Sequence, residues 1–114
     1  MSNLSKLTPQ IRLFVKNDEN GSNAIFGRGV AELCKGVQEK GSLNASAKGM
    51  HMAYSKAWRI VKETEKELGI QMLNRDGAHG STLTEEGEKL LSAYFAVNDS
   101  VQKYAEKELA KHLG

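Results

Sequence analysis

The basic residues in the middle of the chain are the side chains best suited to bind another molecule. From residue 40 to residue 62 the sequence has no Asp or Glu but contains Lys40, Lys48, Lys56, Arg59 and Lys62. The whole chain carries 16 Lys and Arg against 14 Asp and Glu, so a basic middle stands in an otherwise acidic sequence. Such an asymmetry indicates a surface that contacts phosphate groups, although a short basic run also occurs as a solvated helix face.

Three of these cations are spaced for one helix surface. Lys56, Arg59 and Lys62 follow at three-residue intervals, which places them in a loose row. Tyr54 and Ser55 precede the row and could touch bases or phosphates; a partly packed ring and a solvated hydroxyl are the alternatives. Ser42 is a suitable helix N-cap, and a helix N-terminus can also hold a phosphate.

Other chemistries find little support in the sequence. Cys34 is the only cysteine and lies on an apolar stripe, so we expect a buried small side chain and a reducing compartment. His51, His79 and His112 show no pairing typical of a metal site. Phosphate-loop, dinucleotide and nucleophile-elbow patterns do not occur, so we expect no enzyme, metal or cofactor.

Glycines and caps divide the middle of the chain into three helices. Apolar residues from Val30 to Val37 at helical spacing predict a first helix that stops at Gly41. A short second helix should begin after Ser42 and end near Gly49, and a third should span 53–68. Trp58 in the third helix shares a face with apolar neighbours, so we expect a structural anchor rather than a base reader.

The two ends of the chain suggest strands and a long helix. Alternating apolar residues over 11–15 and 24–26, with a turn signal at 20–21, predict an N-terminal β-hairpin. Residues 70–75 and 81–83 predict two short strands around a glycine-rich tip. Thr84 should cap a helix over 85–109, about 37 Å long at 1.5 Å per residue.

That helix is longer than a three-helix core can cover, which predicts a symmetric homodimer. A chain end that folds back or frays after residues 98–100 is the competing possibility. The candidate interface residues are apolar or aromatic and lie along this helix: Leu91, Tyr94, Phe95, Val101 and Tyr104.

The order of elements predicts a mainly α fold with a small β component, a winged helix-turn-helix with an N-terminal hairpin, a two-stranded wing and a long C-terminal helix. Residues 1–83 would form a DNA-binding domain and residues 84–114 its dimerisation helix. In such folds one helix enters the major groove of DNA, here the helix over 53–68. A protein-binding adapter without a nucleic-acid ligand is the alternative function.

Three segments carry a resemblance to a known family: GSLNASAKGMHMAYSKAW (41–58), LGIQMLNR (68–75) and LTEEGEKLL (83–91). They resemble the N-terminal DNA-binding domain of ModE-type molybdate-responsive regulators, itself similar to the LysR-type winged helix. The resemblance implies a homodimeric transcriptional regulator that binds double-stranded DNA.

The wing and the effector depart from this resemblance. It adds Arg75 and His79 at the wing as candidate DNA contacts, but Asp76 brings a negative charge to a tip that is usually basic in the family. The family's molybdate-binding region has no counterpart before Gly114, so molybdate sensing is not carried over and the effector is unknown. No stretch of about 18 apolar residues and no signal-peptide region is found, so we expect a cytoplasmic protein without a membrane partner.

Overall fold

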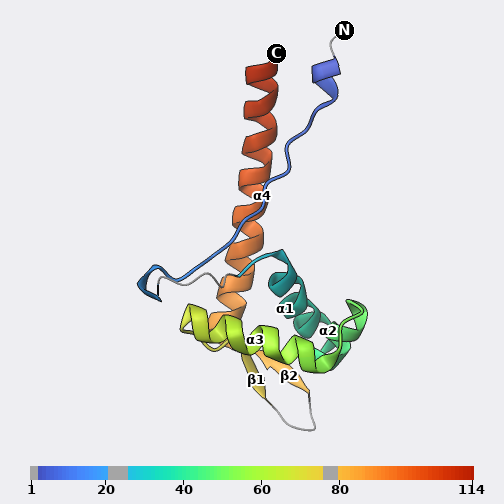
Figure 1. Ribbon diagram of the computed structural model, residues 1–114, viewed down its shortest axis with the longest axis vertical. Coiled ribbons are helices and arrows are strands. Elements are labelled where there is room, and N and C mark those ends of the chain that lie inside the picture. Colours follow the sequence, from blue (N-terminus) through green and yellow to red (C-terminus); the bar gives the residue numbers. More distant parts are fainter. Residues whose placement is uncertain (1–2, 21–25, 76–79) are drawn as a thin grey trace.

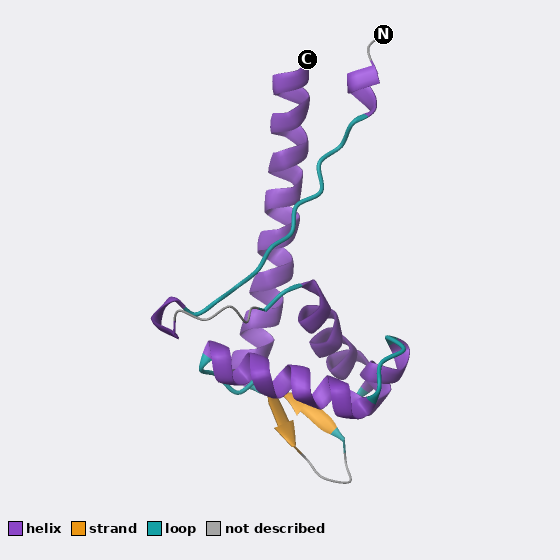
Figure 2. Cartoon of the chain, in the orientation of Figure 1, coloured by secondary structure: helices purple, strands orange, loops and turns teal. Residues whose placement is uncertain are grey.

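A computed structural model describes residues 3–20, 26–75 and 80–114 of the chain (Figure 1). Three helices form a compact unit, two short strands extend from it, and one long helix rises on its other side (Figures 1 and 2). The elements in chain order are η1 (Asn3–Lys6), η2 (Asp18–Asn20), α1 (Arg28–Lys40), α2 (Leu43–Gly49), α3 (Tyr54–Leu68), β1 (Leu73–Arg75), β2 (Ser81–Leu83) and α4 (Glu85–Leu113). The predicted mainly helical fold with a small antiparallel sheet and a long last helix is confirmed.

The helix boundaries follow the local signals in the sequence. Gly41 and Gly69 end α1 and α3 in the left-handed conformation, with φ of 83° and 74°, which glycine adopts without steric cost. The Ser42 and Thr84 hydroxyl groups accept hydrogen bonds from the amides of Ala45 and Gly87 and thereby cap α2 and α4. The predicted stops and caps are therefore confirmed.

Helices α1 and α2 approach each other closely at Gly36. The Ser46 hydroxyl donates a buried hydrogen bond of 2.6 Å to the Leu33 carbonyl, and a Cβ atom on Gly36 would lie 2.0 Å from that hydroxyl oxygen. Around this contact α1, α2 and α3 bury a common core that includes Phe26, and both α4 and the wing close over it. This packing fixes the angle at which α3 is held.

The wing is attached to the helices by polar contacts. Strands β1 and β2 pair antiparallel with Leu73 opposite Leu83. The Glu65 carboxylate on α3 accepts hydrogen bonds from the amides of Met72 (2.7 Å) and Leu73 (3.2 Å), and the Ser81 amide donates to the Gly41 carbonyl (3.2 Å). These hydrogen bonds join the wing to α3 and to the α1–α2 turn.

The N-terminal segment differs from the predicted hairpin. Within the described residues the only strand-like pairing before α1 is one isolated bridge between Val15 and Phe26, and residues 21–25 lie outside them. The segment instead runs beside α4 (Figure 1). Gln102 on α4 accepts from the Ile11 amide (3.1 Å) and donates to the Pro9 carbonyl (2.8 Å), so a helix side chain replaces the partner strand.

In the described parts of the chain, no helix combines the length and the apolar character that a membrane span requires.

Candidate nucleic-acid interface

The outward face of α3 gathers positive charge. At about 100° per residue, Ser55, Arg59, Lys62 and Lys66 fall within a sector of about 60°, opposite the buried residues of this helix. All four are exposed. Among the described residues, no ion pair involves Arg59, Lys62 or Lys66. The face therefore presents three cations to solvent without a competing acid in its sector.

The row of cations predicted on this helix loses Lys56 and gains Lys66. Lys56 is exposed but lies about 60° beyond Arg59, in a sector that it shares with Glu63. Lys66, which the sequence reasoning missed, extends the outward face toward the C-terminal end of α3. Its spacing of seven residues from Arg59 was the available signal, because residues seven apart share a helix face.

Tyr54, Trp58 and Lys62 form a second row on the flank of α3. The indole N–H of Trp58 donates to the Tyr54 hydroxyl, and the two rings meet edge to face with centroids 6.3 Å apart. The Lys62 ammonium lies 5.8 Å from the centre of the Trp58 ring. Trp58 is half-buried and packs against the core with part of its ring, so it both anchors α3 and borders the exposed face.

Ser42 and the wing occupy the edge of this surface. Ser42 is partly buried and caps α2, as expected, and its Cβ lies close to Gly80 at the start of β2. Arg75 ends β1, where it pairs with Ser81 in the strand register. His79 lies outside the described residues. The structure thus brings Ser42 close to the turn end of the β1–β2 pair, with α3 packed beside α2.

The candidate dimerisation residues range from buried to exposed. Leu91 and Tyr94 are buried in the core of the monomer, so their assignment to an outer face needs correction. Phe95 is half-buried, with the Lys35 ammonium 5.3 Å from its ring centre. Val101 and Tyr104 are 42% and 64% exposed, and Val97 is 47% exposed on the same side of α4.

Cys34 has the inert environment predicted for it. It is buried in α1, and burial, with a smaller effect of the Glu65 carboxylate, raises the pKa of its thiol to about 12. A thiol with this pKa is protonated at neutral pH and is therefore a poor nucleophile. Groups of three or more potential metal-ligating side chains do not occur among the described residues.

The helices α2 and α3 with the two-stranded wing form a winged helix-turn-helix, and sequence comparison identifies the family. The profile of the bacterial regulatory helix-turn-helix proteins of the lysR family matches residues 31–88. The chain therefore belongs to the LysR family of regulatory helix-turn-helix proteins. The ModE-type part of the resemblance is not supported by the comparisons.

The chain is also similar in sequence to individual helix-turn-helix regulators. The HTH-type transcriptional regulator CrgA of Neisseria meningitidis serogroup C (strain 8013) is 47% identical over 51 residues, and the serogroup B protein (strain ATCC BAA-335 / MC58) matches equally. The match covers 45% of this chain but only 17% of those relatives.

Solved structures share the fold. A CbnR DBD–DNA complex has a TM-score of 0.61 at 23% identity, over 74% of this chain and 95% of that one. A BenM DBD/benA site 1 DNA complex has a TM-score of 0.57 at 23% identity, over 75% and 96%.

Proposed function

We propose that the chain binds double-stranded DNA sequence-specifically and regulates transcription, with α3 in the major groove. The observation that carries the proposal is the outward face of α3, where Arg59, Lys62 and Lys66 stand exposed with no acid in their sector. The major groove is about 12 Å wide and admits one helix. The two solved relatives named above are complexes with DNA, which supports the same use of this fold here.

The wing and α2 would contact the DNA backbone on either side of α3. Ser42 at the start of α2 and Arg75 at the end of β1 are the candidate contacts, and His79 is proposed from sequence alone. Contacts to phosphate fix the register of a protein on the duplex, whereas side chains at base edges select the sequence. We therefore assign selection to the first half of α3, from Tyr54 to Arg59, and positioning to Lys62, Lys66 and the wing.

A salt titration of binding tests this assignment. Each neutralised phosphate contributes a slope of about −0.9 to log affinity against log salt. Replacing Lys62 with Ala should weaken binding to every duplex and make the slope shallower by about 0.9 per protomer. The matched control is Lys107→Ala on the exposed surface of α4, which should leave the slope unchanged.

The protein-binding adapter remains the alternative function, and the same titration decides between the two. An adapter would show no salt-dependent binding to random duplex at micromolar protein and low salt. A Lys62→Ala variant that binds duplex with the parent slope would contradict the proposed position of α3.

We further propose that the protein acts as a homodimer through α4. Val97, Val101 and Tyr104 are exposed on one side of this helix, with half-buried Leu90 in line with them, whereas the N-terminal segment covers a different side at Gln102. A continuous apolar stripe of this kind favours pairing with a second copy. Pairing would set two copies of α3 about 34 Å apart, the distance of one turn of DNA.

Sedimentation tests the dimer. The parent protein should sediment at about twice 12.5 kDa at tens of micromolar, and a Val101→Asp/Tyr104→Asp variant should sediment as a monomer with weaker DNA binding. Because both side chains are exposed in the monomer, the variant should keep its fold. A parent protein that is monomeric at this concentration would refute the dimer and leave the DNA-binding proposal standing.

The ModE-type character of the segment from Gly41 to Trp58 remains a proposal based on its Tyr-x-x-Ala-Trp ending. We also propose a cytoplasmic location, in agreement with the proposed DNA ligand.

A further inference from the structure

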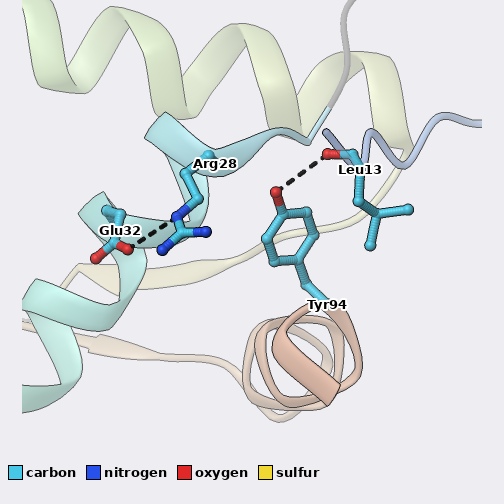
Figure 3. Close-up of polar contacts among 4 residues, drawn as sticks. All are labelled: Leu13, Arg28, Glu32 and Tyr94. Carbon is cyan, nitrogen blue, oxygen red and sulfur yellow. Dashed lines mark hydrogen bonds and ion pairs between the residues drawn. The ribbon is translucent and has the colours of Figure 1, made fainter. Parts of the chain in front are cut away.

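A cavity of about 600 Å³ lies where the N-terminal segment, the start of α1 and the middle of α4 meet. Its walls include Arg12, Phe14, Val30, Tyr94 and Asn98 together with residues 27–29. Figure 3 shows Tyr94 reaching from α4 to the Leu13 carbonyl, to which its hydroxyl donates (3.1 Å), and Arg28 at the start of α1. The volume falls within the range of about 300–1,000 Å³ that is typical of sites for small ligands.

The start of α1 gives this cavity a concentration of hydrogen-bond donors. Gly27 occupies the N-cap position and provides no capping side chain. Among the described residues, the amides of Arg28, Gly29 and Val30 have no acceptor, as expected for the first turn of an uncapped helix. The helix dipole makes the same position favourable for an anion.

Asn98 is an independent sign of a ligand. Asn98 is only 9% exposed, it lines the cavity, and no hydrogen bond of its side-chain amide occurs among the described residues. No enclosed side-chain nitrogen or oxygen lacks a partner among those residues, so the Asn98 amide is open to the cavity. Polar groups at buried positions usually have a hydrogen-bond partner, and a molecule bound in the cavity would supply one for this amide.

The charges around the cavity also favour an anion. Arg12 lines the cavity, is exposed, and forms no ion pair within the described residues. Arg28 is held by Glu32, with 3.3 Å between Nε and the carboxylate (Figure 3), so Arg12 is the cation left to meet a ligand. Leu13, Phe14 and Val30 add an apolar wall beside these groups.

We propose that this cavity binds a small organic anion with a phosphate or carboxylate head. The head accepts hydrogen bonds from the first-turn amides of α1, the Asn98 amide bonds a second polar group, and the apolar body lies against Phe14 and Val30. In Figure 1 α1 begins on the side of the domain away from the wing, so the site is separate from the proposed DNA surface. The inference does not depend on DNA binding, since the site involves none of the residues assigned to DNA.

The test is a titration of the full chain with phenyl phosphate and, separately, with inorganic phosphate. NMR of the amide groups in the absence of DNA monitors the binding. The expected result is a saturable shift of the backbone amide signals of residues 28–30 and of the side-chain amide signal of Asn98. Phenyl phosphate should bind more tightly than inorganic phosphate. Gly29→Asp places a carboxylate in the first turn of α1, where a Cβ would meet no atom within 4 Å. It should weaken phosphate binding by about tenfold, whereas the neutral control Gly29→Asn should bind like the parent.

Asn98→Leu separates a ligand contact from a structural role. Because the amide has no partner in the described structure, this near-isosteric change should leave the melting temperature unchanged or higher and weaken phenyl phosphate binding. A lower melting temperature with unchanged binding would overturn the role of Asn98. The absence of shifts at residues 28–30 with both probes at millimolar concentration, or equal binding by the Asp and Asn variants of Gly29, would overturn the site.

Discussion

Truncation of Trp58 gives the most informative test of how α3 is held. The ring is half-buried, packs in part against the core, meets Tyr54 edge to face and lies beneath the Lys62 ammonium. Trp58→Ala removes all of these contacts together. It leaves Ser55, Arg59 and Lys66 on the outward face, so stability and DNA binding can be measured separately.

The expected loss is smaller than for a tryptophan inside a core. Truncation of a fully buried tryptophan costs roughly 3–5 kcal/mol, and half of that is about 2 kcal/mol. The aromatic pair with Tyr54 adds about 0.5–1 kcal/mol. We therefore expect Trp58→Ala to lower the free energy of unfolding by about 2–3 kcal/mol, or the melting temperature by roughly 10–20 °C for a domain of this size.

Urea and thermal unfolding followed by far-ultraviolet circular dichroism would measure this loss, since Trp58 is the only tryptophan and its fluorescence disappears with it. Tyr54→Phe is the matched control; it keeps the ring and removes only the hydroxyl that accepts the indole N–H, at about 1 kcal/mol or less. A Trp58→Ala variant that unfolds like the parent but no longer binds DNA would refute the reasoning and make Trp58 a base-contacting residue.

Two further predictions concern stability. A Cβ on Gly87 would lie 2.4 Å from the Met72 carbonyl oxygen, so Gly87→Ala should lower the free energy of unfolding, measured by chemical denaturation, by about 1–3 kcal/mol. The control Gly29→Ala, with open space around it, should be neutral or stabilising. Equal effects of the two substitutions would contradict the close approach of α4 to the wing. The Cys34 thiol, with its pKa raised to about 12, stays protonated in the folded state while an unfolded thiol ionises near about 8.5. The contribution of this thiol to the free energy of unfolding should therefore be fully present below about pH 8.5 and should be lost as the pH rises toward 12. Cys34→Ala should remove this part of the pH dependence. An unchanged pH profile of this variant would show that the thiol does not cause it.

The helical part of the fold could be predicted because its signals are local. Gly41 and Gly69 stop their helices by adopting a positive φ, and Ser42 and Thr84 cap theirs with their own hydroxyl groups. Each signal acts within a few residues and needs no tertiary contact. The predicted boundaries of α3 and of the start of α4 consequently agree with the structure to within a residue.

The N-terminal segment could not be predicted because its partner is distant. Burial alternates along residues 11–15 as expected for a strand, but the carbonyl of Leu13 accepts from Tyr94 and the amide of Ile11 donates to Gln102. Contacts across 81 and 91 residues leave no trace in a local pattern. For the same reason the periodicity of α4 did not show that Leu91 faces the monomer core while Val97 faces outward.

Selection of bound sites from a random duplex pool tests the central claim most directly, because the pool contains every sequence that a recognition helix could prefer. The proposed α3 and α4 roles predict enrichment of an inverted repeat whose half-sites are one helical turn, about 10–10.5 base pairs, or a multiple apart. They also predict that Arg59→Ala relaxes the preference at one position in each half-site. A pool that stays random after repeated rounds at low salt would contradict sequence-specific binding by this chain.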